Sequence, residues 1–211
     1  YNVAIGHAAL STEDAHGKNV AVGHNSLLVQ NAGADAYNVA VGFEAGKAVT
    51  TGIKNTSIGA RTMQATTVGQ ENVALGYQAM YTNVDGSKCV AIGANALLTQ
   101  EPASAVDMYN VAVGYNAGYA MTTGVQNTLI GALAGDAITI GRFNTALGYQ
   151  SLSENILTDR NTALGYGTLA SLVGDGSTNN QATYNVAIGH NAGNLMTTGV
   201  ENTIVGALAG D

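Results

Sequence analysis

The chain has 211 residues, of which 10% are charged and 6% are aromatic, and it contains 28 glycines and one proline. Average proteins have roughly a quarter charged residues and about 7% glycine, so this chain is poor in solubilising charge and in bulky core side chains. Its formal net charge of −7, with seven scattered Lys and Arg, argues against nucleic acid and anionic membrane surfaces as partners, because both require a basic face.

Three further features narrow the protein class. No apolar run approaches the roughly 18 residues of a membrane-spanning helix, so we expect no membrane insertion. The single cysteine, Cys89, cannot form an intrachain disulfide, and a Cys-based metal site is not expected. The chain opens within a repeat at Tyr1, so we expect it to be an excerpt of a longer polypeptide, with any targeting signal outside it.

A five-residue motif, Asn-Val-Ala-Ile-Gly at residues 2–6, recurs with small changes along the whole chain. We call its first position the marker. The twelve markers are Asn2, Asn19, Asn38, Asn55, Asn72, Cys89, Asn110, Asn127, Asn144, Asn161, Asn185 and Asn202. Eight of the eleven gaps are 17 residues, and the others are 19, 21 and 24. Insertions therefore fall between motifs, which predicts one coil of a repeat structure per interval.

Four coils form a longer repeat within a single repeat domain, 1–211. The segments 37–60, 109–132 and 184–207 share one pattern, and their starts are 72 and 75 residues apart. The super-repeats are 1–36 (partial), 37–108, 109–183 and 184–211 (partial). Longer loops at 30–36, 99–109 and 171–184 contain Asp35, Glu101, Asp107 and Asp175. Receptor contact is one interpretation of these loops, and a solvated loop without a partner is the default for any single residue.

Within the motif, Val or Thr at the second position and Ile, Val or Leu at the fourth alternate with Ala, which occupies the third position in nine coils. This period of two predicts a β-strand with aliphatic residues on one face and small residues on the other. Seventeen residues at about 3.3 Å each trace a circuit of roughly 56 Å, enough for two short strands and two turns. Such a thin coil must hide its remaining apolar face, which favours self-association.

Glycine occupies the fifth motif position in every coil, which indicates a bend or a close backbone approach. These turn glycines are Gly6, Gly23, Gly42, Gly59, Gly76, Gly93, Gly114, Gly131, Gly148, Gly165, Gly189 and Gly206. A second glycine lies three residues before the next marker in six coils and indicates the opposite turn. We expect the eleven marker asparagines to form a structural ladder from coil to coil, with Cys89 as a tolerated substitute on one rung.

The residue after the turn glycine is aromatic or histidine in eight coils: His7, His24, Phe43, Tyr77, Tyr115, Tyr149, Tyr166 and His190. This possible surface-contact stripe has two interpretations. It could stack against the sugar rings of a surface glycan, or it could fill the contact between neighbouring protomers. The packing interpretation is favoured, because Tyr and His at a wet interface need no ligand to explain them.

The runs at residues 2–10, 110–118 and 185–193 resemble the head repeats of trimeric autotransporter adhesins. The Asn-Thr-Ala-Leu-Gly-Tyr runs at 144–149 and 161–166 resemble the repeats of bacteriophage tail-fibre proteins more closely. The similarity covers essentially the entire chain. Both families imply a homotrimer in which each chain winds a left-handed parallel β-roll used for attachment to a cell surface. Adhesin heads usually have shorter repeats, so the 17-residue spacing favours the fibre family.

We therefore expect an all-β parallel β-roll, a left-handed β-solenoid of about twelve 17-residue coils, packed as a homotrimer. It would be the structural or adhesive shaft or head of an extracellular or virion fibre, with a host-cell glycan or protein as candidate receptor. The sequence has no motif for catalysis, cofactor binding or metal binding, so we do not expect an enzyme.

Three alternatives remain open. One is an acyltransferase on a left-handed hexapeptide β-helix, although Ser11 and Gly17 occupy two corners of the first coil that need aliphatic residues. A glycan-cleaving spike would use paired acids, which here are mostly single. An ice-binding rod would need a regular outward threonine array, which is not sustained.

Overall fold

The computed structural model describes residues 1–13, 16–175 and 180–211. Residues 176–179 of the expected loop 171–184 lie outside this part. The described residues form strands, turns and bends. No helix long and apolar enough to cross a membrane is found among them. The chain divides into two compact units, Tyr1–Met108 and Tyr109–Asp211, and this division falls between the second and third expected super-repeats.

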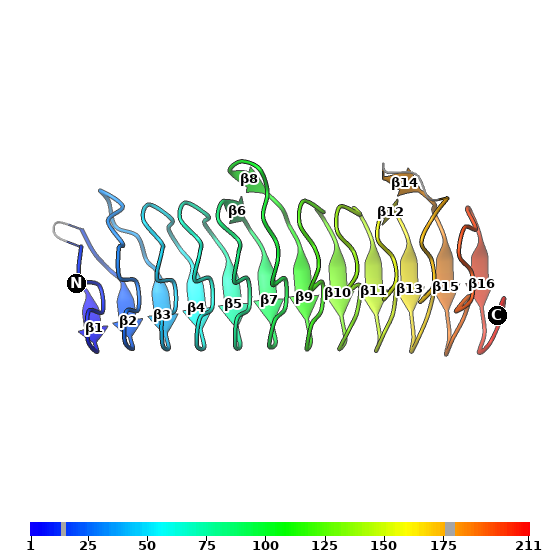
Figure 1. Ribbon diagram of the computed structural model, residues 1–211, viewed down its shortest axis with the longest axis horizontal. Coiled ribbons are helices and arrows are strands. Elements are labelled where there is room, and N and C mark those ends of the chain that lie inside the picture. Colours follow the sequence, from blue (N-terminus) through cyan, green and yellow to red (C-terminus); the bar gives the residue numbers. More distant parts are fainter. Residues whose placement is uncertain (14–15, 176–179) are drawn as a thin grey trace. The chain divides into compact units, whose positions relative to one another are not determined.

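The first unit is a stack of coils, each of which contributes one three-residue strand to a parallel sheet (Figure 1). The strands follow chain order: β1 (Val3–Ile5), β2 (Val20–Val22), β3 (Val39–Val41), β4 (Thr56–Ile58), β5 (Val73–Leu75) and β7 (Val90–Ile92). A two-stranded parallel ladder joins β6 (Gly86–Ser87) to β8 (Val106–Asp107) in the longer loop.

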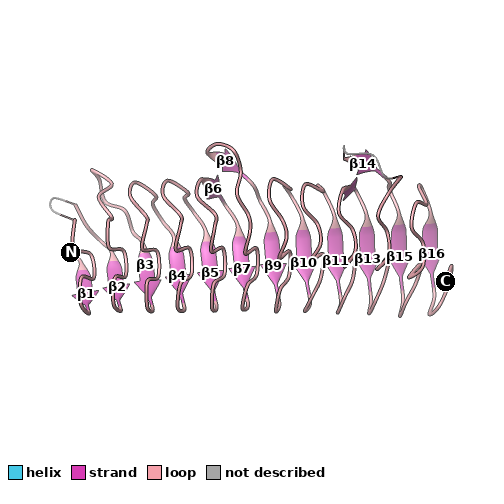
Figure 2. Ribbon diagram, viewed as in Figure 1, coloured by secondary structure: helices cyan, strands magenta, loops and turns pink. Residues whose placement is uncertain are grey.

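The second unit repeats this organisation (Figure 2). Its parallel strands are β9 (Val111–Val113), β10 (Thr128–Ile130), β11 (Thr145–Leu147), β13 (Thr162–Leu164), β15 (Val186–Ile188) and β16 (Thr203–Val205). Its longer loop carries a second short ladder, between β12 (Thr158–Asp159) and β14 (Gln181–Ala182). The predicted all-β parallel solenoid with one coil per repeat is thereby confirmed.

The register places each motif residue opposite its equivalent in the next coil. Val73 pairs with Val90, for example, across a 17-residue interval. Thr162 pairs with Val186 in the same way, although the interval there is 24 residues. The longer intervals therefore leave the strand ladder in register, because the extra residues are accommodated in the loops.

The return side of each coil differs from the second strand that we considered. In the coil that begins at Asn72, Gln78 and Met80 have left-handed backbone conformations, with φ of 54° and 51°. The sixth and eighth residues after the marker are left-handed in every coil. An extended strand cannot accommodate this alternation, so the return side is a series of tight turns. These turns still bond from coil to coil, since Met80 donates its N–H to the carbonyl oxygen of Ala96 at 2.9 Å.

The core inside each coil is lined by the small residues of the strand. Ala74, Ala91 and Ala146 are fully buried, whereas their neighbours in the strand are at least partly exposed. One larger apolar side chain usually fills the rest of the coil. It comes from the eighth residue after the marker, as in Leu152, or from the eleventh, as in Ile138, where the eighth residue is glycine.

Candidate functional site

The marker asparagines form a buried column inside each unit, and their side chains link successive coils. The Oδ1 of Asn38 accepts the backbone N–H of Asn55 at 2.8 Å, and Oδ1 of Asn127 accepts that of Asn144 at 3.0 Å. The same bond connects neighbouring markers throughout the first unit (Asn2, Asn19, Asn38, Asn55, Asn72 and Cys89) and the second (Asn110, Asn127, Asn144, Asn161, Asn185 and Asn202). The side-chain amide thus extends the backbone ladder by one rung.

The other end of each amide holds its own coil closed. Nδ2 of Asn127 donates to the carbonyl oxygen of Gly141, fourteen residues later, at 2.8 Å. Asn55 and Asn72 make the same bond to the second glycine of their coils, Gly69 and Gly86, also at 2.8 Å. This contact explains why asparagine recurs: one planar group satisfies a donor in the next coil and an acceptor in its own.

Cys89 supplies the backbone N–H of its rung, which donates to Asn72 Oδ1 at 2.9 Å. Its sulfur lies 3.3 Å from Nε2 of Gln100, a buried side chain of the same coil. The sulfur also lies 3.5 Å from the carbonyl oxygen of Ser87, so the cysteine side chain keeps polar partners.

The twelve turn glycines all have positive φ, between 127° and 142°. A Cβ on Gly59 would lie 2.7 Å from the carbonyl oxygen of Gly76, and one on Gly76 would lie 2.6 Å from that of Gly93. Both the conformation and the approach of the next coil therefore require glycine. The glycine at the end of each strand therefore has a role in stacking the coils.

The outer face of each sheet consists of the second and fourth motif residues. Every strand has Val or Thr at the first of these positions and Ile, Val or Leu at the second. Leu75, Leu147 and Leu164, each the last residue of its strand, are 45%, 45% and 40% exposed, which is high for leucine. Each unit thus presents an uncharged face of aliphatic and threonine side chains that is partly exposed to solvent.

The aromatic and histidine stripe runs beside this face, and its neighbouring rings are stacked where consecutive coils carry them. In the first unit His24 lies 5.2 Å from His7 and 5.4 Å from Phe43 between ring centroids. In the second unit Tyr166 lies 5.3 Å from Tyr149 and 5.0 Å from His190. Tyr77 and Tyr115 are 51% and 56% exposed. The stripe is interrupted where Ala60, Ala94, Ala132 and Ala207 take the position.

Three of the four acidic loop residues make polar contacts, and the fourth is exposed. Asp35 pairs with Lys18 at 2.7 Å, and this hydrogen bond holds the pKa of Asp35 below its usual value. Asp107 pairs with Lys88 at 2.6 Å. The backbone N–H of Asp175 donates to Gln181 Oε1 at 3.0 Å, and Glu101 is exposed. The loop carboxylates Asp35 and Asp107 therefore hold their loops onto the coils.

Sequence reasoning missed a further column, formed by the residue immediately before each marker. We call it the corner column: Tyr1, Lys18, Tyr37, Lys54, Glu71, Lys88, Tyr109, Gln126, Phe143, Arg160, Tyr184 and Glu201. From Lys18 onward each has a left-handed backbone. The signal in the sequence is that every member is long or aromatic and none is aliphatic. Cations and rings are neighbours in this column: Nζ of Lys18 lies 5.0 Å from the ring centroid of Tyr37.

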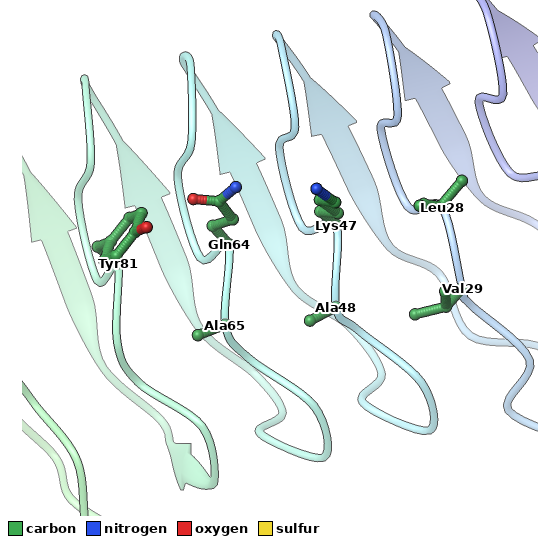
Figure 3. A pocket seen from close by; sticks show the side chains of 7 residues that line it. All are labelled: Leu28, Val29, Lys47, Ala48, Gln64, Ala65 and Tyr81. Atoms are coloured by element: carbon green, nitrogen blue, oxygen red, sulfur yellow. The ribbon is translucent and has the colours of Figure 1, made fainter.

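A shallow groove of about 380 Å³ lies on the return side of the first unit. Its side chains form two rows: Tyr81, Gln64, Lys47 and Leu28 in one, and Ala65, Ala48 and Val29 in the other (Figure 3). Below the groove Glu44 accepts hydrogen bonds from Lys47, at 2.8 Å, and from Gln64. The bond from Lys47 lowers the pKa of Glu44. Lys47 and Gln64 of this groove are thus already engaged within the protein.

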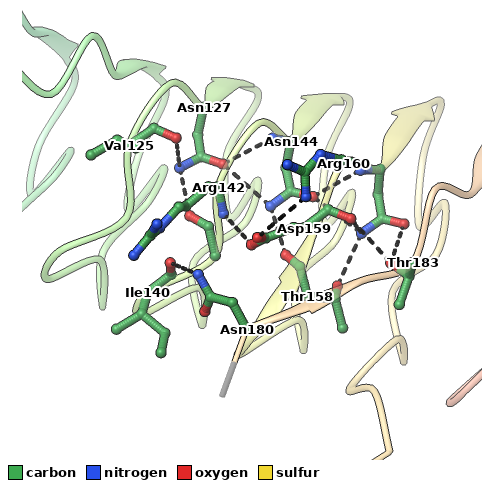
Figure 4. Close-up of polar contacts among 12 residues, drawn as sticks. Val125, Asn127, Ile140, Arg142, Asn144, Thr158, Asp159, Arg160, Asn180 and Thr183 are labelled. Atoms are coloured by element: carbon green, nitrogen blue, oxygen red, sulfur yellow. Dashed lines mark hydrogen bonds and ion pairs between the residues drawn. The ribbon is translucent and has the colours of Figure 1, made fainter.

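Strand β12, which pairs with β14 of the longer loop in the second unit, contains a buried carboxylate, Asp159 (Figure 4). Its Oδ1 accepts the backbone N–H of Arg142 at 2.7 Å, and its Oδ2 lies 3.9 Å from Nη1 of Arg160. Burial raises the pKa of Asp159 more than these contacts lower it. Nearby, Asn180 ties the loop to the coils by donating to the Ile140 carbonyl oxygen at 2.8 Å.

No protein-family model, curated protein or solved structure matches the chain. Among the described residues, no group of three or more His, Cys, Asp or Glu side chains is arranged to hold a metal ion. The arguments for function therefore depend on the faces and columns described above.

Proposed function

We propose that this chain is the structural and adhesive shaft or head of a homotrimeric fibre, on a virion or a cell surface, that mediates attachment. One observation carries the proposal: in both units the outer strand face is an uncharged surface of aliphatic and threonine side chains that the described part of its own chain leaves partly exposed. Monomeric soluble proteins rarely leave a contiguous apolar face of this kind exposed. Covering it with copies of the same face removes that surface from water.

A second and third copy of the chain suit this face better than an unrelated partner. The face is uncharged in every coil, and its side chains are Val or Thr followed by Ile, Val or Leu, so the same face of another copy can pack against it. Parallel alignment of identical chains places equivalent coils at equal heights, and aromatic residues of the adjacent stripe then meet their counterparts. A symmetric assembly satisfies every copy at once. The number three, the left-handed coiling and the location on a fibre come from the resemblance to tail-fibre and adhesin repeats.

The test is the mass of the protein in solution, measured by sedimentation equilibrium. We expect a species of about three times the 21.3-kDa chain mass. Replacing Leu147 and Leu164 together with Lys should shift the mass to that of one chain, because buried unpaired ammonium groups are strongly unfavourable. The matched control is Leu195→Lys on the return side. Leu195 is 67% exposed, so this variant should keep the wild-type mass.

A monomer at high concentration in the wild-type protein would contradict the proposal. So would a trimer that survives the double Lys replacement. The hexapeptide-type enzyme is not favoured by the coil geometry, since such a helix has three strand-bearing faces per coil, whereas each coil here contributes one strand to its main sheet.

A further inference from the structure

The corner column of the second unit contains a guanidinium group stacked between two exposed rings. Cζ of Arg160 lies 5.0 Å from the ring centroid of Phe143 and 5.5 Å from that of Tyr184. These three residues come from consecutive coils. Phe143 and Tyr184 are 42% and 52% exposed, and the Arg160 side chain is 41% exposed. Stacking on aromatic faces holds the guanidinium plane while its N–H edge stays available for hydrogen bonds.

The charge of Arg160 is poorly compensated within the chain. Among the described residues its nearest carboxylate oxygen is Asp159 Oδ2, at 3.9 Å, which is beyond hydrogen-bond distance. The side chain of Asp159 is 8% exposed, and its other oxygen already accepts the Arg142 backbone N–H. Asp159 therefore faces inward and leaves the outer edge of Arg160 open.

The other cations of the chain differ from Arg160 and from Arg142, the arginine of the preceding coil. Each of the four lysines has a carboxylate oxygen within 3.2 Å, and Arg61 has one at 3.6 Å. Within the described part of the chain, the side chain of Arg142 has no carboxylate within 4 Å, and Arg142 lies in the coil before Arg160. A chain with a net charge of −7 thus carries two positive charges in adjacent coils that share one buried carboxylate, Asp159, next to two exposed rings.

We propose that Phe143, Arg160 and Tyr184 form a binding site for an acidic sugar, in which the carboxylate of a uronic or sialic acid accepts hydrogen bonds from the Arg160 guanidinium edge. Arginine presents two parallel N–H groups that match the planar carboxylate. The exposed parts of the two rings then offer apolar contact to the C–H groups of the sugar ring, which a small inorganic anion cannot use. Arg142 adds attraction at longer range.

This site rests on the proposed attachment function and names a ligand class for it. The corner column precedes the strand, at the opposite end from the turn glycine. The aliphatic face can therefore be covered by other copies of the chain while the corner column remains at the rim of the contact. Glu201 follows Tyr184 in the corner column, so a ligand that extends past Tyr184 meets a negative charge there.

The test is calorimetric titration of the assembled protein with trigalacturonic acid, its methyl ester, 3′-sialyllactose and lactose. We expect at least one acid to bind, and its ester or neutral counterpart to bind at least tenfold more weakly. Arg160→Gln should abolish the difference, and Arg160→Lys should weaken acid binding several-fold because the forked geometry is lost. Phe143→Ala should weaken it by a comparable factor. Arg61→Gln is the control, since Arg61 lies near the Phe43 ring but beside Glu44, and it should bind like the wild type.

Several outcomes would overturn the site. They are equal binding of acid and neutral forms, acid binding that survives Arg160→Gln, and equal affinity for inorganic phosphate or for an acidic peptide. Unfolding midpoints of the variants separate lost binding from lost folding. If the protein sedimented as the expected trimer but bound no acidic sugar, the site would fail and the fibre proposal would stand. A monomer would contradict the fibre proposal whatever it bound.

Discussion

The two faces of the strands use the same short motif in opposite ways. The inner face carries alanine between a buried asparagine and a turn glycine, and all three positions are restricted by the neighbouring coil. The outer face carries the larger aliphatic residues, yet Leu75 and Leu147 are each 45% exposed. In an ordinary domain the larger apolar residues would lie inside. The difference shows that the interior of so thin a coil has room only for small strand residues. The larger apolar residues of the strand therefore lie on its outer face.

The largest effect is expected where two coils approach most closely. Gly76→Val should prevent folding of the first unit or cost more than about 4 kcal/mol, because the φ of 130° and the nearby Gly93 oxygen both exclude a side chain. Denaturation followed by circular dichroism measures the loss. Gly33→Ala is the control: Gly33 also has positive φ, but nothing lies within 4 Å of an added Cβ, so about 1 kcal/mol is expected. Equal losses would show that backbone conformation alone decides.

The next largest effect concerns the inner asparagine column. Asn127→Ala should cost about 2–4 kcal/mol, because the N–H of Asn144 and the carbonyl of Gly141 both lose a buried partner. Asn2→Ala, in the exposed first coil, should cost about 1 kcal/mol, since solvent replaces the lost bonds. Urea denaturation of both variants gives the comparison. A small loss of unfolding free energy in Asn127→Ala would mean that the asparagine column contributes little to the stability of the fold.

Space inside the coil can be tested in a single strand. Ala146→Leu should cost about 1–3 kcal/mol by overpacking, because Leu152 already fills that coil. In the preceding coil the equivalent residue is Leu129, and Gly135 takes the place of Leu152. A Cβ on Gly135 would lie 2.8 Å from a methyl of Leu129. Adding Leu152→Gly to Ala146→Leu should therefore recover part of the loss. If the double variant is no more stable than Ala146→Leu alone, the side chains at 146 and 152 do not compete for the same space.

The smallest effect is a pH dependence of opposite sign in the two units. Burial raises the pKa of Asp159, so its contribution to stability is present at low pH and is lost as the pH rises through that raised value. Hydrogen bonding from Lys47 lowers the pKa of Glu44, so its contribution is present above the unfolded-state pKa and is lost as the pH falls. Asp159→Asn should gain stability at neutral pH, and Glu44→Gln should lose it. Unfolding midpoints measured between pH 3 and 8 check both directions.

Much of this architecture could be predicted from the residues. The recurrence of Asn, Ala and Gly at fixed positions predicted coils in register, and the pairing of Thr162 with Val186 shows why insertions did not disturb it. The return side was less predictable, because a left-handed backbone at Gln78 or Met80 has no obligatory residue type. The corner column was missed for a related reason: its members differ in charge, and only their common size relates them.

The sequence by itself determined the period of the coils, the position of each strand and the need for glycine after it, since these follow from local sterics repeated twelve times. Only the tertiary structure decided which strand face points inward. Alternation with a period of two distinguishes two faces but does not say which one fits a narrow interior, and that depends on the room left by the return side of the same coil. The stacking of Arg160 between Phe143 and Tyr184 was likewise decided there, because residues 17 and 24 positions apart meet only when the coils are stacked.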